Sequence, residues 1–244
     1  MAPDHIGMGL SDKPGEDRYT YTLDSRVDDL DALTDHLIAT GRAPEHGWTL
    51  VMHDWGGPIG MAWAARHPER IARLVVLNTA AFPYPRGEHV RPLLRVPFHV
   101  LRQTRLGTRL FQQVNLFARG ATWRPLGVWR RMPADVRAAF VAPYDRPAHR
   151  LPIQRFVQDI PMRPGDRAWN TFVHTAAALQ QFNDRPVLLA WGLRDFVLDT
   201  TLLHEWQQRF PAAVTRTYPR AGHYLLEDVH QQLIPAIGDF LRTG

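Results

Sequence analysis

Asp54 is the residue of this chain best placed to act as a nucleophile. The apolar run Trp48–Met52 leads to it, and small residues follow at once, at positions Gly56, Gly57 and Gly60. Small residues just after a carboxylate allow a tight turn from a strand into a helix. The N-terminus of that helix favours the ionised carboxylate and offers N–H groups to a developing anion. This pattern is typical of a nucleophile elbow with Asp in place of Ser. It would also fit an Asp that only caps a helix.

Two further residues follow Asp54 in an order that suggests a catalytic triad. Asp195 comes just after the apolar run Pro186–Gly192, and His223 follows a glycine in a loop before the last predicted helix. The chain order of nucleophile, acid and histidine is that of α/β-hydrolase triads. We therefore predict that Asp54, Asp195 and His223 are the catalytic residues.

Strand-like and helix-like segments alternate around these residues. Apolar runs at 48–52, 73–79, 186–192 and 213–218 predict short strands, the middle two buried on both faces. Helical patterns cover residues 25–40, 56–67, 200–210 and 229–242. In the first of these helices, Ser25 is the expected N-cap and Gly41 the expected residue after the C-cap. The alternation predicts an α/β fold with a mostly parallel sheet flanked by helices.

Residues 83–185 interrupt that alternation and are called the lid segment below. They are rich in Pro and Arg and contain helical patches without a convincing strand. We expect an inserted helical lid here, with residues 1–82 and 186–244 forming the core. The lid segment has seventeen Arg and six acidic residues, a net charge of +11. Because the Arg residues are dispersed and no nucleic-acid-binding motif accompanies them, we expect a solvated face or a docking surface for an acidic partner, and no nucleic acid.

Composition narrows the function classes. The 244 residues are 45% hydrophobic and 22% charged, which is typical of a globular protein. The absence of Cys excludes thiolate nucleophiles and thiolate-bound metals. No apolar run could span a bilayer and no signal peptide is recognisable, so we expect a cytoplasmic protein. Neither His spacing nor the Gly7–Gly9 segment predicts a metal or organic cofactor.

Four segments give the sequence a specific resemblance. They are APDHIGMGLSDKP (2–14), VMHDWGGPIG (51–60), WGLRDFVLD (191–199) and AGHYLLED (221–228). Together they resemble the haloalkane dehalogenase branch of the α/β-hydrolase fold over the whole chain. Two more segments, LNTAAF (77–82) and FVQDIPMRPGD (156–166), resemble the subgroup containing the cis-β-lactone decarboxylases of bacterial olefin biosynthesis. Since both lie in or beside the lid segment, we expect them to affect the choice of substrate.

The resemblance implies a role for each site residue. Asp54 would attack an sp³ carbon and form a covalent ester. His223 would activate water against that ester, with Asp195 orienting the imidazole. Trp55 matches the dehalogenase Trp whose indole N–H holds the departing halide. In the decarboxylases, the same Asp would open a lactone ring before carbon dioxide is lost and a cis-alkene remains.

One expected segment of the family is missing. No His-Gly-Asn/Glu-Pro sequence, which supplies an oxyanion-hole N–H, occurs in the chain. The chain begins at what resembles the end of the fourth strand of the family, so we expect an N-terminal truncation that removes the first strands. Without the family's third strand, the strand that ends at Pro3 should have no ladder partner beside residues 48–52, and buried backbone groups should stay unpaired.

Several functions stay open at this point. A small hydrophobic substrate fits both a β-lactone decarboxylase and a haloalkane dehalogenase, and the lid resemblance favours the first. An epoxide hydrolase would require lid Tyr hydroxyls, for which Tyr84 and Tyr144 are the candidates. An inactive remnant whose basic lid only docks partners is a further alternative. The resemblance also implies assembly with other enzymes of the olefin pathway.

Overall fold

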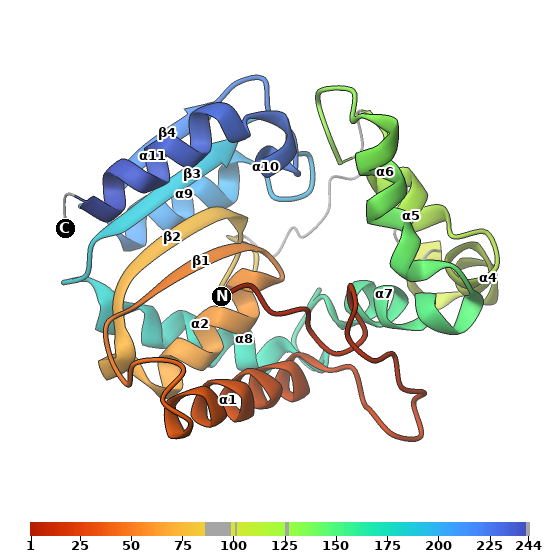
Figure 1. Cartoon of the computed structure of the whole chain (residues 1–244), viewed down its shortest axis with the longest axis horizontal. Coiled ribbons are helices and arrows are strands. Elements are labelled where there is room, and N and C mark those ends of the chain that lie inside the picture. Colours follow the sequence, from red (N-terminus) through yellow and green to blue (C-terminus); the bar gives the residue numbers. More distant parts are fainter. Residues whose placement is uncertain (86–98, 101, 125–126, 243–244) are drawn as a thin grey trace.

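The fold is built on one parallel β-sheet (Figure 1). The computed structural model describes residues 1–85, 99–100, 102–124 and 127–242. Its sheet has four strands in the order β1-β2-β3-β4, all parallel. They are β1 (Trp48–Asp54), β2 (Ile71–Thr79), β3 (Val187–Gly192) and β4 (Val214–Tyr218). All four strands predicted from the apolar runs are confirmed.

The strand register brings the candidate residues to one edge of the sheet. Asp54 at the end of β1 is paired with Thr79 at the end of β2, and Gly192 at the end of β3 is paired with Tyr218 on β4. The loop that contains Asp195 and the loop that contains His223 both start from this edge. Ligands of parallel α/β sheets bind at the carboxyl ends of the strands, so this edge is where chemistry is expected.

Helices cover the two faces of the sheet unequally. One face packs against α1 (Leu23–Ala39), α2 (Gly56–Arg66), α8 (Trp169–Ala178) and α9 (Thr200–Arg209) in a single hydrophobic cluster. The other face packs against α10 (Leu225–Asp228) and α11 (His230–Arg242), which contact side chains of β2 and β3. β1 is less covered there, and Val51 at its centre is 54% exposed.

β1 also forms the edge of the sheet. Among the described residues, β2 is its only hydrogen-bonded neighbour. Residues 1–22 contain turns but no strand or helix. The strand expected to end at Pro3 is not formed, and within the described part of the chain no strand lies on the side of β1 opposite β2.

The first helix begins earlier than the sequence pattern predicted. Thr22 is the N-cap of α1, and Ser25, which we expected to be the N-cap, lies three residues inside and completes a capping box with Thr22. The helix starts one turn earlier because Leu23 is buried and its N–H is bound by the Asp159 carboxylate. At the other end, Gly41 adopts a φ of 69° and closes the helix as predicted.

Four helices of the lid segment form a separate layer at the right of Figure 1. They are α4 (Arg105–Gln112), α5 (Leu116–Ala121), α6 (Ala134–Val141) and α7 (Pro147–Asp159). α8 belongs to the same segment but packs on α2 within the core cluster. The short 3₁₀ helices are Pro68–Arg70, Ala142–Tyr144 and Leu179–Phe182. No described residue of the lid segment is in a strand.

The structure also bears on membrane insertion. None of the helices in the described part of the chain combines the length and the apolar character that crossing a bilayer requires.

Candidate active site

Asp54 lies at a strained bend between β1 and α2. Its φ of 49° is in the left-handed region, which a residue with a side chain rarely adopts. Gly57 allows this bend, because a Cβ at that position would come within 1.9 Å of Thr79 Oγ1 and 2.6 Å of the Ala80 carbonyl oxygen. The Thr79 hydroxyl in turn donates a hydrogen bond to the Asp54 carbonyl oxygen. Strain of this kind persists where the surroundings enforce it and is frequent at active sites.

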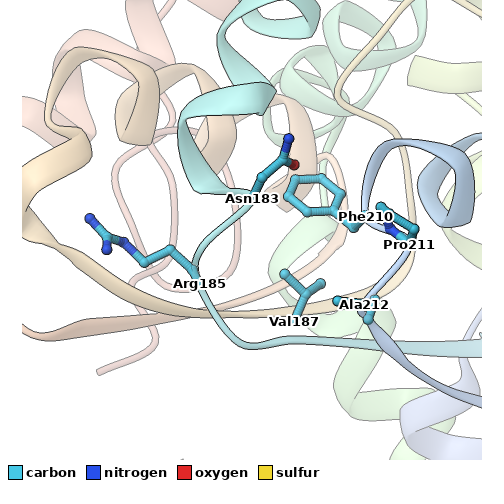
Figure 2. A pocket seen from close by; sticks show the side chains of 7 residues that line it. Asn183, Arg185, Val187, Phe210, Pro211 and Ala212 are labelled. Carbon is cyan, nitrogen blue, oxygen red and sulfur yellow. The ribbon is translucent and has the colours of Figure 1, made fainter.

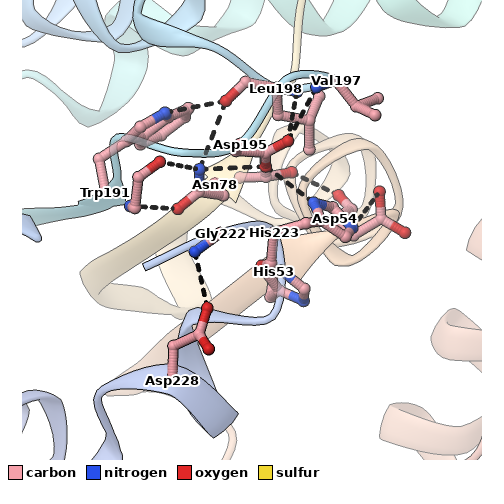
Figure 3. A network of polar contacts seen from close by, with 12 residues as sticks. His53, Asp54, Asn78, Trp191, Asp195, Val197, Leu198, Gly222, His223 and Asp228 are labelled. Carbon is pink, nitrogen blue, oxygen red and sulfur yellow. Dashed lines mark hydrogen bonds and ion pairs between the residues drawn. The ribbon is translucent and has the colours of Figure 1, made fainter. Parts of the chain in front are cut away.

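The structure brings together the three residues predicted as a triad (Figure 3). His223 Nδ1 donates a hydrogen bond to Asp195 Oδ2 at 2.8 Å. The opposite ring nitrogen, Nε2, lies 3.7 Å from Asp54 Oδ1. The Asp54 carboxylate is 45% exposed, whereas that of Asp195 is fully buried. One carboxylate can therefore meet a substrate while the other holds the imidazole.

Asp195 is fixed by donors from three directions. Its Oδ1 accepts the backbone N–H groups of Val197 at 2.9 Å and Leu198 at 3.0 Å. Its Oδ2 accepts the side-chain amide of Asn78 at 3.1 Å besides the imidazole. Burial alone would raise the pKa of Asp195, but the charge and hydrogen bond of His223 and the two backbone donors outweigh it and lower that pKa. The carboxylate is thus kept ionised beside the imidazole.

Asn78 is a site residue that the sequence reasoning missed. It is fully buried near the end of β2, and its Oδ1 accepts the Gly192 N–H at 2.7 Å. Residues 77–79 form the end of β2, as the strand predicted at 73–79 implies, and Asn78 supports Asp195 from there. An effect of the segment 77–82 on substrate choice stays a prediction.

The two flanking carboxylates favour the charged form of His223. Burial opposes that charge, but Asp195, through its charge and hydrogen bond, and then Asp54 raise the pKa of His223 to about 9. At neutral pH the free site therefore holds an imidazolium between two carboxylates. If Asp54 became esterified, it would lose its charge, and the pKa of His223 would fall towards the range of a general base.

His53 supports the same loop from the strand that precedes Asp54. Its Nε2 lies 2.8 Å from the His223 carbonyl oxygen, and the two rings lie 4.8 Å apart. Burial and the charge of His223 lower the pKa of His53 to about 4. A neutral His53 can donate one N–H to a carbonyl oxygen, so Nε2 is assigned as the protonated nitrogen. His53 thereby fixes the backbone of the residue that carries the imidazole.

Backbone hydrogen bonds join the lid segment to the His223 loop. The buried Asp228 carboxylate accepts the N–H groups of Gly222 at 2.7 Å, Trp129 at 2.8 Å and Arg130 at 2.7 Å. The Tyr224 N–H also donates to the Gly127 carbonyl oxygen at 2.8 Å. The Asp228 carboxylate therefore ties Gly222 to residues 129 and 130, and the separate Tyr224–Gly127 bond ties the other side of His223 to the same stretch.

Trp55 faces the lid segment from the start of α2. Its ring meets that of Phe156 on α7 edge to face, with the centroids 5.2 Å apart. The buried Arg26 guanidinium lies 3.6 Å from the Phe156 ring centre and 5.9 Å from that of Trp55. Trp55 thus lies beside Asp54 at the contact between core and lid. Its role in holding a leaving group stays a prediction.

The two Tyr candidates for an epoxide hydrolase are engaged elsewhere. The Tyr84 hydroxyl donates to Asp199 Oδ1 at 2.9 Å. The Tyr144 hydroxyl donates to Met8 Sδ at 3.3 Å and accepts the Gly9 N–H at 3.4 Å. These contacts do not favour a role for either hydroxyl at a substrate oxygen.

A small hollow occurs at the opposite end of β3 (Figure 2). It measures about 130 Å³ and is lined by Asn183, Arg185, Val187, Phe210, Pro211, Ala212 and Ala213. Val187 begins β3, whereas Asp195 follows the other end of that strand. The hollow is therefore separate from the candidate site. Within the described ranges, no three His, Asp or Glu side chains are grouped so that they could hold a metal ion.

Comparisons with known proteins identify the family of this chain. A family model described as the alpha/beta hydrolase fold matches residues 1–228. A cis-3-alkyl-4-alkyloxetan-2-one decarboxylase from Xanthomonas campestris pv. campestris is 48% identical, over 100% of this chain and 79% of that protein. Haloalkane dehalogenase 1 from Mycobacterium bovis is 32% identical, over 96% of this chain and 71% of that protein.

A solved structure extends the likeness to three dimensions. A putative ancestral haloalkane dehalogenase superposes with a TM-score of 0.81 at 26% identity, over 99% of this chain and 81% of that one. This chain therefore shares sequence with the decarboxylase and the dehalogenases, and fold with the dehalogenase structure. It also has the elbow, the order of the three polar residues and the parallel sheet.

Proposed function

The chain is an enzyme of the α/β-hydrolase family, and from that membership we propose that it converts a cis-β-lactone into an alkene and carbon dioxide, with Asp54 as nucleophile. The proposal is carried by the position of the Asp54 carboxylate, half-exposed at the elbow and 3.7 Å from His223 Nε2. The more similar of the two relatives bears a name that specifies a four-membered lactone with two alkyl groups. A carboxylate is suited to attack on such a strained ring.

The reaction can be written so that its atoms balance. An oxygen of Asp54 bonds to the ring carbon that carries the ring oxygen, and the bond between those two ring atoms breaks. The product is an ester on Asp54 whose neighbouring carbon bears a free carboxylate. Breaking the bond to that carboxylate releases carbon dioxide, forms the double bond and expels the Asp54 carboxylate. Inversion in the first step followed by anti loss in the second keeps the alkyl groups cis.

The neighbouring residues have distinct tasks in this route. The His223 imidazolium, held by Asp195, would stabilise the Asp54 carboxylate before attack and after its release. The Trp55 indole N–H is proposed to donate to the carboxylate that forms on ring opening. Water is not consumed. The resemblance to proteins of olefin biosynthesis suggests that this enzyme works with others of that pathway.

Haloalkane dehalogenation is the second candidate. It is supported by the relative and the solved structure that bear this name. Here halide would leave on attack by Asp54, and His223, once its pKa falls on esterification, would activate water against the ester. The two candidates share the nucleophile and differ in whether water enters the product.

Product analysis tests the proposal. We expect a cis-β-lactone to give alkene and carbon dioxide, and a bromoalkane to give little bromide. Asp54→Asn should abolish turnover. Asp54→Ala should abolish it too, and this variant cannot regain a carboxylate, whereas the Asn side chain could do so by hydrolysis of its amide. Bromide release without alkene would assign the second function instead. Undiminished turnover in Asp54→Ala would overturn the role of Asp54 in both.

A further inference from the structure

The stretch 105–124, which includes α4 and α5, combines exposed apolar side chains with exposed Arg residues. Five large apolar residues within 18 positions are between 43% and 57% exposed: Leu106, Val114, Leu116, Phe117 and Trp123. Among them lie the exposed residues Arg105, Arg109, Arg119 and Arg124. These nine residues are called the basic apolar face. No Asp or Glu occurs between Glu88 and Asp135, so the sequence of this face is free of acidic residues.

The fold explains why these side chains point outward. On α4, Gly107 and Phe111 face inward, which turns Leu106 and Arg109 to the opposite side of the helix. Phe117 on α5 is stacked on the buried Phe111 at 5.3 Å and reaches the surface from there. The two helices lie in the layer furthest from the sheet (Figure 1). Phe111 and Ala118 of these helices are buried in a hydrophobic cluster, whereas Leu106, Leu116 and Phe117 stay exposed.

Together these features fit one kind of partner. Exposed apolar side chains that are grouped mark interaction sites more often than single ones do, and five occur here within 18 residues. Arg residues without acidic neighbours favour a surface of uniform negative charge, and aromatic side chains beside Arg are typical of helices that lie in a membrane interface. Trp123 shows this arrangement directly, since the Arg137 guanidinium lies 4.6 Å from its ring centre. A nucleic-acid backbone would match the charges but would leave the apolar side chains without a partner.

We propose that the basic apolar face docks onto the surface of an anionic lipid bilayer. The Arg side chains would contact lipid headgroups, and Leu106, Phe117 and Trp123 would enter the boundary with the acyl chains. Docking of this kind needs no membrane-spanning helix. It does not depend on which substrate Asp54 attacks, so it can fail or succeed independently of the proposed reaction.

Sedimentation with vesicles tests the proposal. We expect the protein to sediment with vesicles of equal parts phosphatidylglycerol and phosphatidylcholine and to stay in the supernatant with pure phosphatidylcholine. An Arg near an anionic surface contributes about fivefold to partitioning, so Arg105→Gln, Arg109→Gln and Arg119→Gln combined should weaken binding on the order of 100-fold. The matched control, Arg42→Gln, Arg216→Gln and Arg220→Gln, removes the same charge from exposed positions of the core and should bind almost as the parent does.

The apolar contribution is tested separately. Leu106→Ser with Trp123→Ser should weaken vesicle binding by roughly tenfold or more, since both lose apolar surface that would be buried. Val214→Ser with Ile234→Ser removes exposed apolar side chains from the core and should have little effect. Absence of binding to the anionic vesicles would overturn the proposal, as would equal losses in the lid and control variants. If this surface binds an acidic protein instead, the protein should not bind to the anionic vesicles.

Discussion

The side-chain amide of Asn78 donates a hydrogen bond to Asp195 Oδ2 at 3.1 Å, behind the carboxylate that holds His223. The same side chain accepts the Gly192 N–H through its oxygen. Asn78 therefore links the ends of β2 and β3 and restrains Asp195 from the buried side. This restraint determines how the imidazole is presented to Asp54.

Replacing that amide by a carboxylate tests the restraint. In Asn78→Asp the acceptor for Gly192 is kept, but the donor to Asp195 becomes a second negative charge. A hydrogen bond to a charged group contributes about 1.5–3 kcal/mol, so we expect kcat to fall roughly 10- to 150-fold. The pH profile should shift as well, because the Asp195–His223 pair is perturbed. The control Asn183→Asp makes the same change at an exposed position, and unchanged kcat in Asn78→Asp would disprove the role of the amide.

His223 separates the two candidate reactions. In the decarboxylating route the ester on Asp54 breaks down without water, whereas hydrolysis of an alkyl ester needs a general base. In His223→Gln we therefore expect slow alkene formation from a lactone to persist. A bromoalkane should instead leave an alkyl group on Asp54, visible as added mass on the peptide that contains it. Loss of alkene formation together with a trapped adduct from the lactone would contradict the water-free route.

The charge of His223 also predicts how stability depends on pH. Its pKa is raised from 6.5 to about 9 in the folded protein, so folding favours the protonated form. The stabilisation is fully present below pH 6.5 and is lost as the pH rises through 9. Because the side chain is only 15% exposed, the loss should be about 3 kcal/mol. Urea unfolding of the parent between pH 6 and 9.5 should show this loss of stability. In His223→Gln the free energy of unfolding should change less with pH. If the unfolding free energies of the parent and of His223→Gln changed equally with pH, His223 would not be the source of the pH dependence.

Two adjacent glycines of the elbow should respond oppositely to the same substitution. A Cβ on Gly57 would lie 1.9 Å from Thr79 Oγ1, so Gly57→Ala should destabilise the fold by about 1–3 kcal/mol or more and disturb Asp54. A Cβ on Gly56 would meet only Met52 Cβ at 3.9 Å, so Gly56→Ala should be neutral or stabilise by up to about 1 kcal/mol. Unfolding free energies from denaturant titration measure both. Similar losses at the two positions would refute the close approach of Gly57 to Thr79.

Local sequence was enough to predict the sheet and the order of the three polar residues. The apolar runs of β2 and β3 are short, continuous and fully enclosed at their centres, and that pattern is visible along the chain. Asp54 and His223 could be selected because glycines beside them mark sharp turns. The start of α1 was harder, since it depends on a bond from Leu23 to Asp159, 136 residues away.

The support of the site could not be predicted, because its partners are distant in sequence. Asn78 and Asp195 are 117 residues apart, and nothing around Asn78 in the sequence indicates a buried amide. His53 and Asp228 likewise act through backbone groups of other segments, which have no signature in residue type. The sequence also did not indicate that Val51 is exposed. Its exposure depends on which segments cover β1, and the apolar run of β1 does not show this.

The hydrogen bonds that link Gly127 to Tyr224, and Trp129 and Arg130 to Asp228, affect how this enzyme could be recombined with its relatives. A chimera that exchanges residues 83–185 as a block would also replace the partners that position the histidine. Grafts that leave 127–130 in place would exchange other parts of the insertion and keep these contacts. The useful crossover points for engineering therefore lie inside the insertion and not at its ends.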